Sequence, residues 1–181
     1  MAAEQGLHHY DSVSRTFHWT MAALVLGLMA LGLAVDAFPR DWERGVVQVH
    51  VAFGAITLLL LVLRVAWRLT HAAPPVSEAG GALMALLAKV GHLGLYVVVA
   101  AVLVAGLATA FSRGLPIDFG IFSIPSPIAA DRALARPTKE VHELLSWALM
   151  AMVAVHAAAA VWHERVLRDG TMQRMLGPRT P

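Results

Sequence analysis

Four long apolar stretches without a charged residue constrain the fold of this chain more than any other feature. They cover residues 16–35, 45–63, 90–112 and 144–163. A helix needs roughly 20 such residues to cross a bilayer, and charged side chains at its ends can reach back to the interface. The sequence therefore predicts four membrane-spanning helices, near residues 14–37, 46–70, 82–110 and 139–167.

The composition of the 181-residue chain supports a membrane protein. Hydrophobic residues make up 58% of it and charged residues 14%, whereas a soluble domain has about 45–50% and about 25% of these classes. A soluble enzyme and a disordered chain are therefore poor fits. The formal net charge is only +2 and no basic cluster is interleaved with aromatic residues, so we expect no nucleic-acid partner. The absence of cysteine excludes disulfides, iron–sulfur clusters, thiolate metal sites and covalently attached haem.

The predicted fold class is all-α, an integral membrane four-helix bundle that forms a single domain over residues 1–181. The first stretch is longer than the apolar core of a signal peptide, about 7–15 residues, so we expect it to be retained. The outer loop 111–138 contains four prolines and must lie outside the lipid. An even number of spans places both termini on one side. The 14 Lys and Arg residues divide eight to six in favour of that side, which predicts cytoplasmic termini.

Histidines lie at informative spacing within these spans. An ionisable side chain inside a membrane span is costly, so it is a functional hypothesis by default. His142 and His156 are 14 residues apart, which places them within about 40° of the same helix face and about 21 Å apart along the axis. One imidazole therefore lies near each leaflet, and both face the same interior.

Depth in the membrane predicts two histidine pairs, an inner pair of His18 and His156 and an outer pair of His50 and His142. At each of these two depths, two imidazoles could bind the metal of one flat macrocycle that lies between them. A structural zinc ion would need about four converging ligands instead. Without cysteine such a haem would be b-type, and two axial imidazoles favour electron transfer over oxygen binding. The alternative is that these are hydrogen-bonded histidines of a packed interior.

Arg64 adds a further candidate at the inner level. It lies 14 residues after His50 and therefore shares its helix face about 21 Å deeper. A guanidinium there could bind a haem propionate, or it could simply reach the inner headgroups. Gly54, one turn after His50, could leave room for a macrocycle.

The inner boundary carries candidates for a quinone site. His163 lies seven residues after His156, where a quinone head could reach it, and an imidazole can exchange a proton near neutral pH. His92 could hold a haem edge or a backbone carbonyl. The other inner-side candidates are Lys89, His92, Ser14 and Arg15. Outside the spans we expect a loop for His71 and a solvated tail for His8 and His9.

Six segments of the chain form a recognisable ordered set. They are residues 10–19 (YDSVSRTFHW), 49–69 (VHVAFGAITLLLLVLRVAWRL), 91–96 (GHLGLY), 139–147 (KEVHELLSW), 155–160 (VHAAAA) and the tail 172–179. Together they resemble the bacterial cytochrome b561 family, and in particular its small four-helix members that hold two haems and are linked to quinone.

This resemblance implies an oxidoreductase of the bacterial inner membrane with two b haems, whose axial ligands would be His18, His50, His142 and His156. It implies a superoxide oxidase, which passes electrons from superoxide to ubiquinone. Other members of the family anchor a dehydrogenase or hydrogenase and relay electrons to or from quinone, so a redox partner protein is the alternative. A haem-free transporter with a histidine proton relay is a third possibility, but the spans show no broken inverted repeats.

The outer connections carry charges that bear on an anionic substrate. These connections contain six cations and five acidic residues, a net charge of +1. A local positive funnel could steer superoxide, and ordinary interface charges are the alternative. The six cations are Arg40, Arg44, Arg113, Arg132, Arg136 and Lys139.

Overall fold

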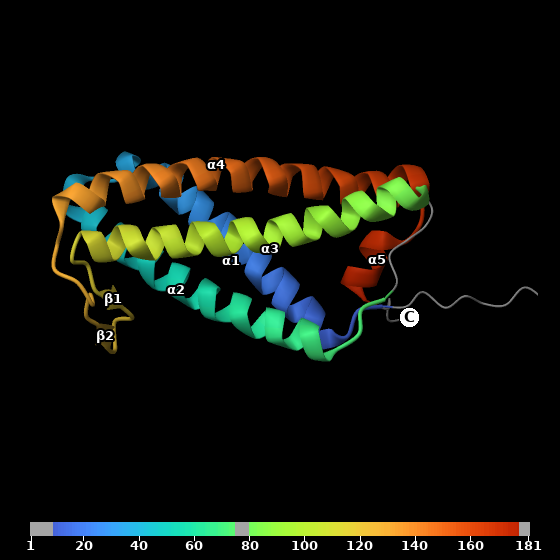
Figure 1. The fold of residues 1–181 in the computed structure, drawn as a ribbon, viewed down its shortest axis with the longest axis horizontal. Helices are drawn as coiled ribbons and strands as arrows, with labels where there is room; N and C mark the ends of the chain where they lie inside the picture. The colour runs from blue at the N-terminus through green and yellow to red at the C-terminus, as the bar shows by residue number, and fades with distance from the viewer. Residues whose placement is uncertain (1–8, 75–79, 178–181) are drawn as a thin grey trace, which may run out of the picture.

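The computed structural model describes residues 9–74 and 80–177, and its main elements are four long helices (Figure 1). They are α1 (Ser12–Ala34), α2 (Arg40–Thr70), α3 (Gly81–Ser112) and α4 (Arg132–Trp162). All four are long and apolar enough to cross a membrane. The predicted all-α four-helix membrane bundle is thereby confirmed as the fold class.

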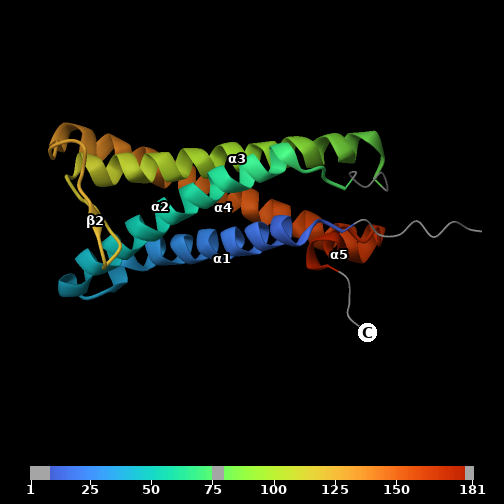
Figure 2. The same cartoon turned by 90° about the horizontal axis from the view of Figure 1, so that it is seen from below.

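The bundle is built from two helix pairs. α1 packs against α2, α3 packs against α4, and α2 also contacts α3; in Figure 2, α2 and α4 run obliquely between α3 above and α1 below. Where the helices meet, a small buried cluster forms the core. Its members are Met21, Leu61, Val99, Val102, Leu103 and Leu149. The rest of the helix surface keeps many large apolar side chains exposed, as expected of helices surrounded by lipid rather than water.

The helices begin where the local sequence supplies a cap. Asp11 caps α1 by accepting hydrogen bonds from the backbone N–H (2.8 Å) and hydroxyl (2.6 Å) of Ser14. α2 begins at Arg40, earlier than the predicted residue 46, because Pro39 is well suited to the position before a helix and the charged residues that follow still favour helix. A short 3₁₀ turn, Val35–Ala37, joins α1 to α2.

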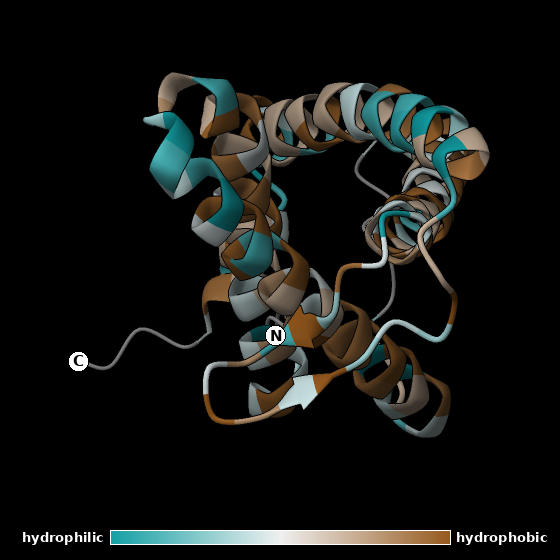
Figure 3. Ribbon diagram, turned by 90° about the vertical axis from the view of Figure 1, so that its left-hand side faces the viewer, coloured by the Kyte–Doolittle hydropathy of each residue, from teal (hydrophilic) through white to brown (hydrophobic). Residues whose placement is uncertain are grey.

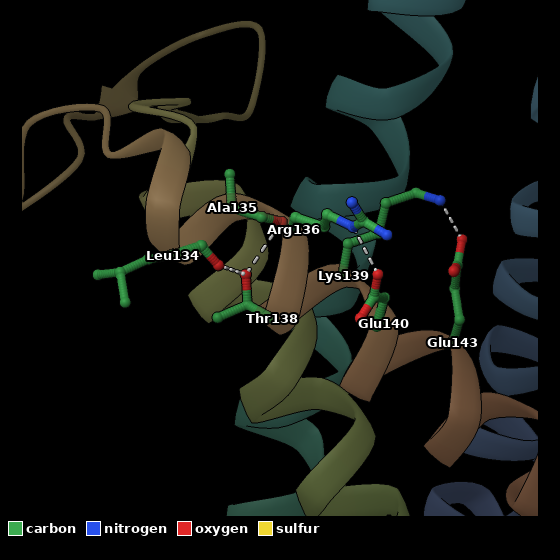
Figure 4. A network of polar contacts seen from close by, with 7 residues as sticks. All are labelled: Leu134, Ala135, Arg136, Thr138, Lys139, Glu140 and Glu143. Carbon is green, nitrogen blue, oxygen red and sulfur yellow. Dashed lines mark hydrogen bonds and ion pairs between the residues drawn. The ribbon is translucent and has the colours of Figure 1, made fainter.

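α4 also begins earlier than predicted, and the expectation of a loop over residues 132–138 is wrong. Asp131 caps the helix by accepting from the backbone of Ala133 and Leu134. Pro137 removes only one backbone donor near the helix start, and the hydroxyl of Thr138 donates to the carbonyls of Leu134 and Ala135 (Figure 4). A proline near a helix start is thus compatible with helix where a cap and side-chain bonds support it.

The connection between α3 and α4 contains a small hairpin that the sequence did not predict. Its strands β1 (Ile117–Asp118) and β2 (Ser123–Ile124) are antiparallel, with Ile117 opposite Ile124. Ile117 is buried, and β1 packs against α2. The tip between the strands is apolar and projects outward, with Ile121 91% and Phe122 55% exposed. Figure 3 views the bundle from this end and shows hydrophilic residues near the starts of α2 and α4.

The opposite end of the bundle carries a π-helical turn and a short helix, the last elements that the structure describes. α-Helical bonding ends at Trp162, a π-helical turn covers His163–Leu167, and the short α5 (Thr171–Leu176) follows. The chain reverses through Arg168 (φ 52°) and Gly170 (φ 70°), both in the left-handed region. α5 was not predicted.

α5 is fastened to the start of α1 and to the residues just before it. The final four carbonyls of a helix lack partners within it, and here each has a partner among residues 9–19. The carbonyls of Gln173, Arg174, Met175 and Leu176 meet, in order, His9 Nδ1 (3.2 Å), Tyr10 N (3.1 Å), Trp19 Nε1 (3.1 Å) and Arg15 Nη1 (3.3 Å). The expectation that His9 belongs to a solvated tail is therefore wrong, while His8 lies outside the described residues.

Candidate functional site

The outer pair of histidines lies between α2 and α4. The ring centres of His50 and His142 are 6.2 Å apart, and the ring planes are nearly perpendicular at 87°. His142 Nδ1 lies 3.0 Å from the carbonyl oxygen of Val102 on α3. A carbonyl only accepts, so Nδ1 must carry the hydrogen and Nε2 keeps its lone pair. This is the arrangement of a metal-binding histidine, whose second ring nitrogen is held by a protein acceptor.

Each outer imidazole rests against a glycine of the neighbouring helix. A Cβ at Gly106 of α3 would lie 3.0 Å from Cε1 of His142, and one at Gly32 of α1 would lie 3.4 Å from Cε1 of His50. The missing side chains let both rings approach a helix backbone closely. Nδ1 of His50 is buried without a hydrogen-bond partner in the described part of the chain.

The inner pair lies between α1 and α4. The ring centres of His18 and His156 are 6.3 Å apart, at an interplanar angle of 54°. The ring of His92 from α3 packs edge-on against His156, with centres 5.3 Å apart. His92 Nδ1 donates to the carbonyl of Ala88, one turn earlier in its own helix (2.6 Å). The sequence predicts that His92 holds either a haem edge or a backbone carbonyl. In the structure its Nδ1 binds a backbone carbonyl.

Arg64 reaches the inner pair from α2, as its spacing from His50 predicted. Its Nη2 lies 3.2 Å from Nδ1 of His18, and its guanidinium lies over the ring of Tyr96, 5.3 Å from the centre. Because a guanidinium only donates, Nδ1 of His18 is the acceptor in this arrangement. A metal ion on Nε2 of His18 would place the hydrogen on Nδ1, and Arg64 would then need a different acceptor.

The spacing within both pairs fits one iron held between two imidazoles. An imidazole nitrogen binds a first-row transition metal at about 2.0 Å, and it lies about 1.1 Å from the centre of its ring, whose bonds are about 1.3 Å long. Two imidazoles on opposite faces of one iron therefore have ring centres about 6.2 Å apart. Within the described residues no group of three or more His, Asp or Glu could hold a bare metal ion. The donor set thus fits haem iron at each of two levels.

His163, the candidate for quinone, lies in the π turn that follows α4. Its Nδ1 is 2.6 Å from Oδ2 of Asp169, and both side chains are shielded, at 17% and 5% exposure. The other inner-side candidates have different roles. Ser14 bonds the cap residue Asp11, Arg15 bonds a carbonyl of α5, and Lys89 is exposed on α3.

The outer cations are only partly available to an anion. Arg136 pairs with Glu140 at 2.8 Å, and Lys139 pairs with Glu143, both one turn apart on α4 (Figure 4). For Arg40, Arg44, Arg113 and Arg132, no carboxylate of the described residues lies within ion-pair distance.

Sequence reasoning missed the residues that support these side chains. Gly32, Gly106 and Tyr96 act through contacts across helices, which spacing along one helix does not reveal. Asp169 follows His163 by six residues, which in a continuous α-helix would put it on a different face. Only the π turn and the chain reversal bring the two together.

Comparisons with known proteins show the family of the chain. The sequence pattern of the prokaryotic cytochrome b561 family matches residues 9–178. The chain is 31% identical over 171 residues to cytochrome b561 homolog 2 of Escherichia coli, covering 93% of this chain and 91% of that protein. It is 29% identical over 169 residues to the probable superoxide oxidase CybB of Yersinia pestis, covering 92% and 95%. It is 28% identical over 176 residues to cytochrome b562 of Cereibacter sphaeroides, covering 94% and 96%. The chain is therefore a member of the prokaryotic cytochrome b561 family, a family of electron-transfer membrane proteins that bind haem b.

Proposed function

We propose that this protein binds two b haems, one between His18 and His156 and one between His50 and His142. The observation that carries the proposal is the spacing of both imidazole pairs, 6.3 Å and 6.2 Å between ring centres. When bound by these histidines, haem b would supply a one-electron centre. The contact of His142 Nδ1 with the carbonyl of Val102 leaves Nε2 as the proposed iron-binding atom. Arg64, once it leaves His18, would bind a propionate.

The proposed activity is electron transfer from superoxide to ubiquinone in the bacterial inner membrane. In this proposal the end that holds α5 faces the cytoplasm and the hairpin end faces the periplasm. The name of the Yersinia pestis relative, a probable superoxide oxidase, supports superoxide as donor. Arg40, Arg44, Arg113 and Arg132 at the hairpin end supply positive charge without close carboxylate partners in the described part. His163 is the proposed contact of the quinone head at the cytoplasmic end.

One preparation tests both halves of the proposal. The purified protein should contain two haems per chain and show a low-spin reduced-minus-oxidised spectrum. Superoxide added to the oxidised protein should reduce haem rapidly, and added ubiquinone should reoxidise it. A single haem per chain would overturn the ligand scheme. Two haems that superoxide does not reduce would overturn the choice of donor.

A second candidate function is a subunit that docks a larger redox enzyme. It is favoured by the apolar tip of the hairpin, where Ile121 and Phe122 project outward, because exposed apolar patches often mark interaction sites. A docking subunit should reduce slowly with superoxide and should co-purify with its partner. Replacing Ile121 and Phe122 by serine should release that partner and leave the haem content unchanged.

A further inference from the structure

The π turn at the end of α4 places one carboxylate against one imidazole. Oδ2 of Asp169 lies 2.6 Å from Nδ1 of His163, and the backbone of the two residues is joined by a bond from Asp169 N to the carbonyl of His163 (3.4 Å). The intervening Arg168 adopts a left-handed conformation, φ 52°. Non-glycine residues rarely adopt it, and π turns are frequent at functional sites.

The contact defines the chemistry of the imidazole. A carboxylate accepts the hydrogen of Nδ1, which leaves Nε2 as the atom that can gain or lose a proton. The Asp169 side chain is only 5% exposed, so its contact with the ring is largely shielded from water. The neighbouring carboxylate Glu164 bonds Gln173 of α5 instead, at 3.3 Å.

A purely structural role explains part of this arrangement. Oδ1 of Asp169 accepts the backbone N–H of Thr171 (3.0 Å) and so supports the start of α5. That bond uses one carboxylate oxygen and needs no histidine. The second oxygen, Oδ2, is committed to His163, the residue proposed above to contact the quinone head.

Resting on that proposed function, we propose that His163 and Asp169 form a proton-donating dyad for the quinone, in which His163 donates from Nε2 and Asp169 is the positioning residue. Reduction of a quinone to a quinol takes two electrons and two protons. Each superoxide gives up one electron and leaves as dioxygen. In the step assigned to His163, its Nε2–H bond breaks and an O–H bond forms on a quinone oxygen as the quinone is reduced. Water on the same side returns a proton to Nε2, and Asp169 stays ionised throughout.

The test uses the full-length, haem-loaded protein and does not depend on superoxide. A soluble ubiquinol is mixed anaerobically with the oxidised protein, and haem reduction is followed by stopped flow, in H₂O and in D₂O. The variants are Asp169→Asn, which keeps a hydrogen-bonding group but removes the charge, and Asp169→Glu, which keeps the charge. Glu164→Gln is the matched control, since it removes a nearby carboxylate that bonds Gln173 rather than His163.

Asp169→Asn should lower the maximal rate about 10- to 100-fold, the usual effect of losing such a supporting partner. Its KM for quinol should change little, and its solvent isotope effect should rise as proton transfer becomes rate-limiting. Asp169→Glu should recover part of the rate, and Glu164→Gln should match the wild type. Equal defects in Asp169→Asn and Asp169→Glu, or a wild-type rate in Asp169→Asn, would overturn the dyad.

The outcome separates the dyad from the choice of electron donor. If ubiquinol reduces haem but superoxide does not, superoxide is the wrong donor and the dyad is still judged by its variants. If ubiquinol does not reduce haem in the wild-type protein, the quinone site and the dyad are overturned together.

Discussion

His142 has the most completely defined environment of the proposed haem ligands. Its Nδ1 is held by the carbonyl of Val102, its ring rests on Gly106, and its Nε2 is left for a metal. Two helices, α3 and α4, thus determine where one imidazole lies. This side chain is therefore the most informative one to remove.

Replacing His142 by alanine should lower the haem content from two to one per chain without unfolding the bundle. The inner pair lies about four turns away along α4 and should keep its haem. Haem is counted by pyridine haemochrome assay against protein mass, and the fold is checked by far-UV circular dichroism. His71→Ala, which alters a ring stacked on Trp67 at the end of α2, is the control and should keep both haems. Two haems in His142→Ala would refute the outer pairing.

Gly106→Ala should disturb the outer site without removing a ligand. The new methyl would lie 3.0 Å from Cε1 and 3.2 Å from Nδ1 of His142, so the ring must move away and its bond to Val102 must weaken. We expect the affinity for the outer haem to fall about 10-fold. This is the usual effect of losing a hydrogen-bond partner that supports a metal ligand. A haem-transfer assay to an apoprotein acceptor measures this. Gly45→Ala, where a Cβ meets nothing within 4 Å, should behave as wild type.

The pairing of the histidines could be predicted from the sequence, whereas their supports could not. Fourteen residues bring an α-helix back to nearly the same face, so His142 and His156 had to share one face. Gly32, Gly106 and Asp169 matter only because another helix or a turn of unusual geometry approaches them. Those approaches depend on packing between segments far apart in the chain.

At the scale of elements, the long helices were predictable and their ends were not. An apolar segment that is long enough to cross a bilayer has few alternatives to an α-helix. The ends depend on caps and turns, such as Asp131 before α4 and the π turn after it. Two-residue strands and the six-residue α5 are too short for any hydrophobic period to appear.

The cap of α1 should make the protein sensitive to acid. Burial alone would raise the pKa of Asp11, but hydrogen bonds from the Ser14 hydroxyl and backbone and from the Trp67 indole together lower that pKa below its usual value of 3.8. A carboxyl whose pKa is lower in the folded state stabilises the fold above its unfolded pKa, and this stabilisation is lost as the pH falls through the folded value.

Asp11→Ala should therefore destabilise the protein by about 1 kcal/mol near neutral pH, the typical effect of losing a helix cap. The difference from the wild type should shrink as the pH falls below 4, where the wild-type carboxyl itself becomes protonated. Thermal unfolding in detergent, followed by circular dichroism at several pH values, measures both quantities. If the difference in stability between the variant and the wild type stays constant down to pH 2, the charge of Asp11 does not contribute to stability.

At the scale of the whole molecule, the bundle presents two different ends. One carries the hairpin with its apolar tip and the charged starts of α2 and α4. The other carries the π turn, α5 and the start of α1 with the residues just before it, joined by hydrogen bonds. An electron donor and an electron acceptor that approach from opposite ends would therefore contact different kinds of side chain.

The orientation in the membrane can be tested directly because the chain has no cysteine. Ser123→Cys places a thiol on the exposed hairpin, and Arg165→Cys places one on the exposed side of the π turn. In intact spheroplasts a membrane-impermeant maleimide should label the first variant, and it should label the second only after permeabilisation. The reverse pattern would refute cytoplasmic termini and would place the proposed quinone contact on the periplasmic side.

The fastening of α5 to the start of α1 has a consequence for biogenesis. The partners of its last four carbonyls come from residues 9–19, which leave the ribosome before α5 does. These hydrogen bonds cannot form until α5 has been translated, and the inner imidazole pair likewise joins the first helix to the fourth. Insertion of the proposed inner haem must therefore wait until α4 has been synthesised.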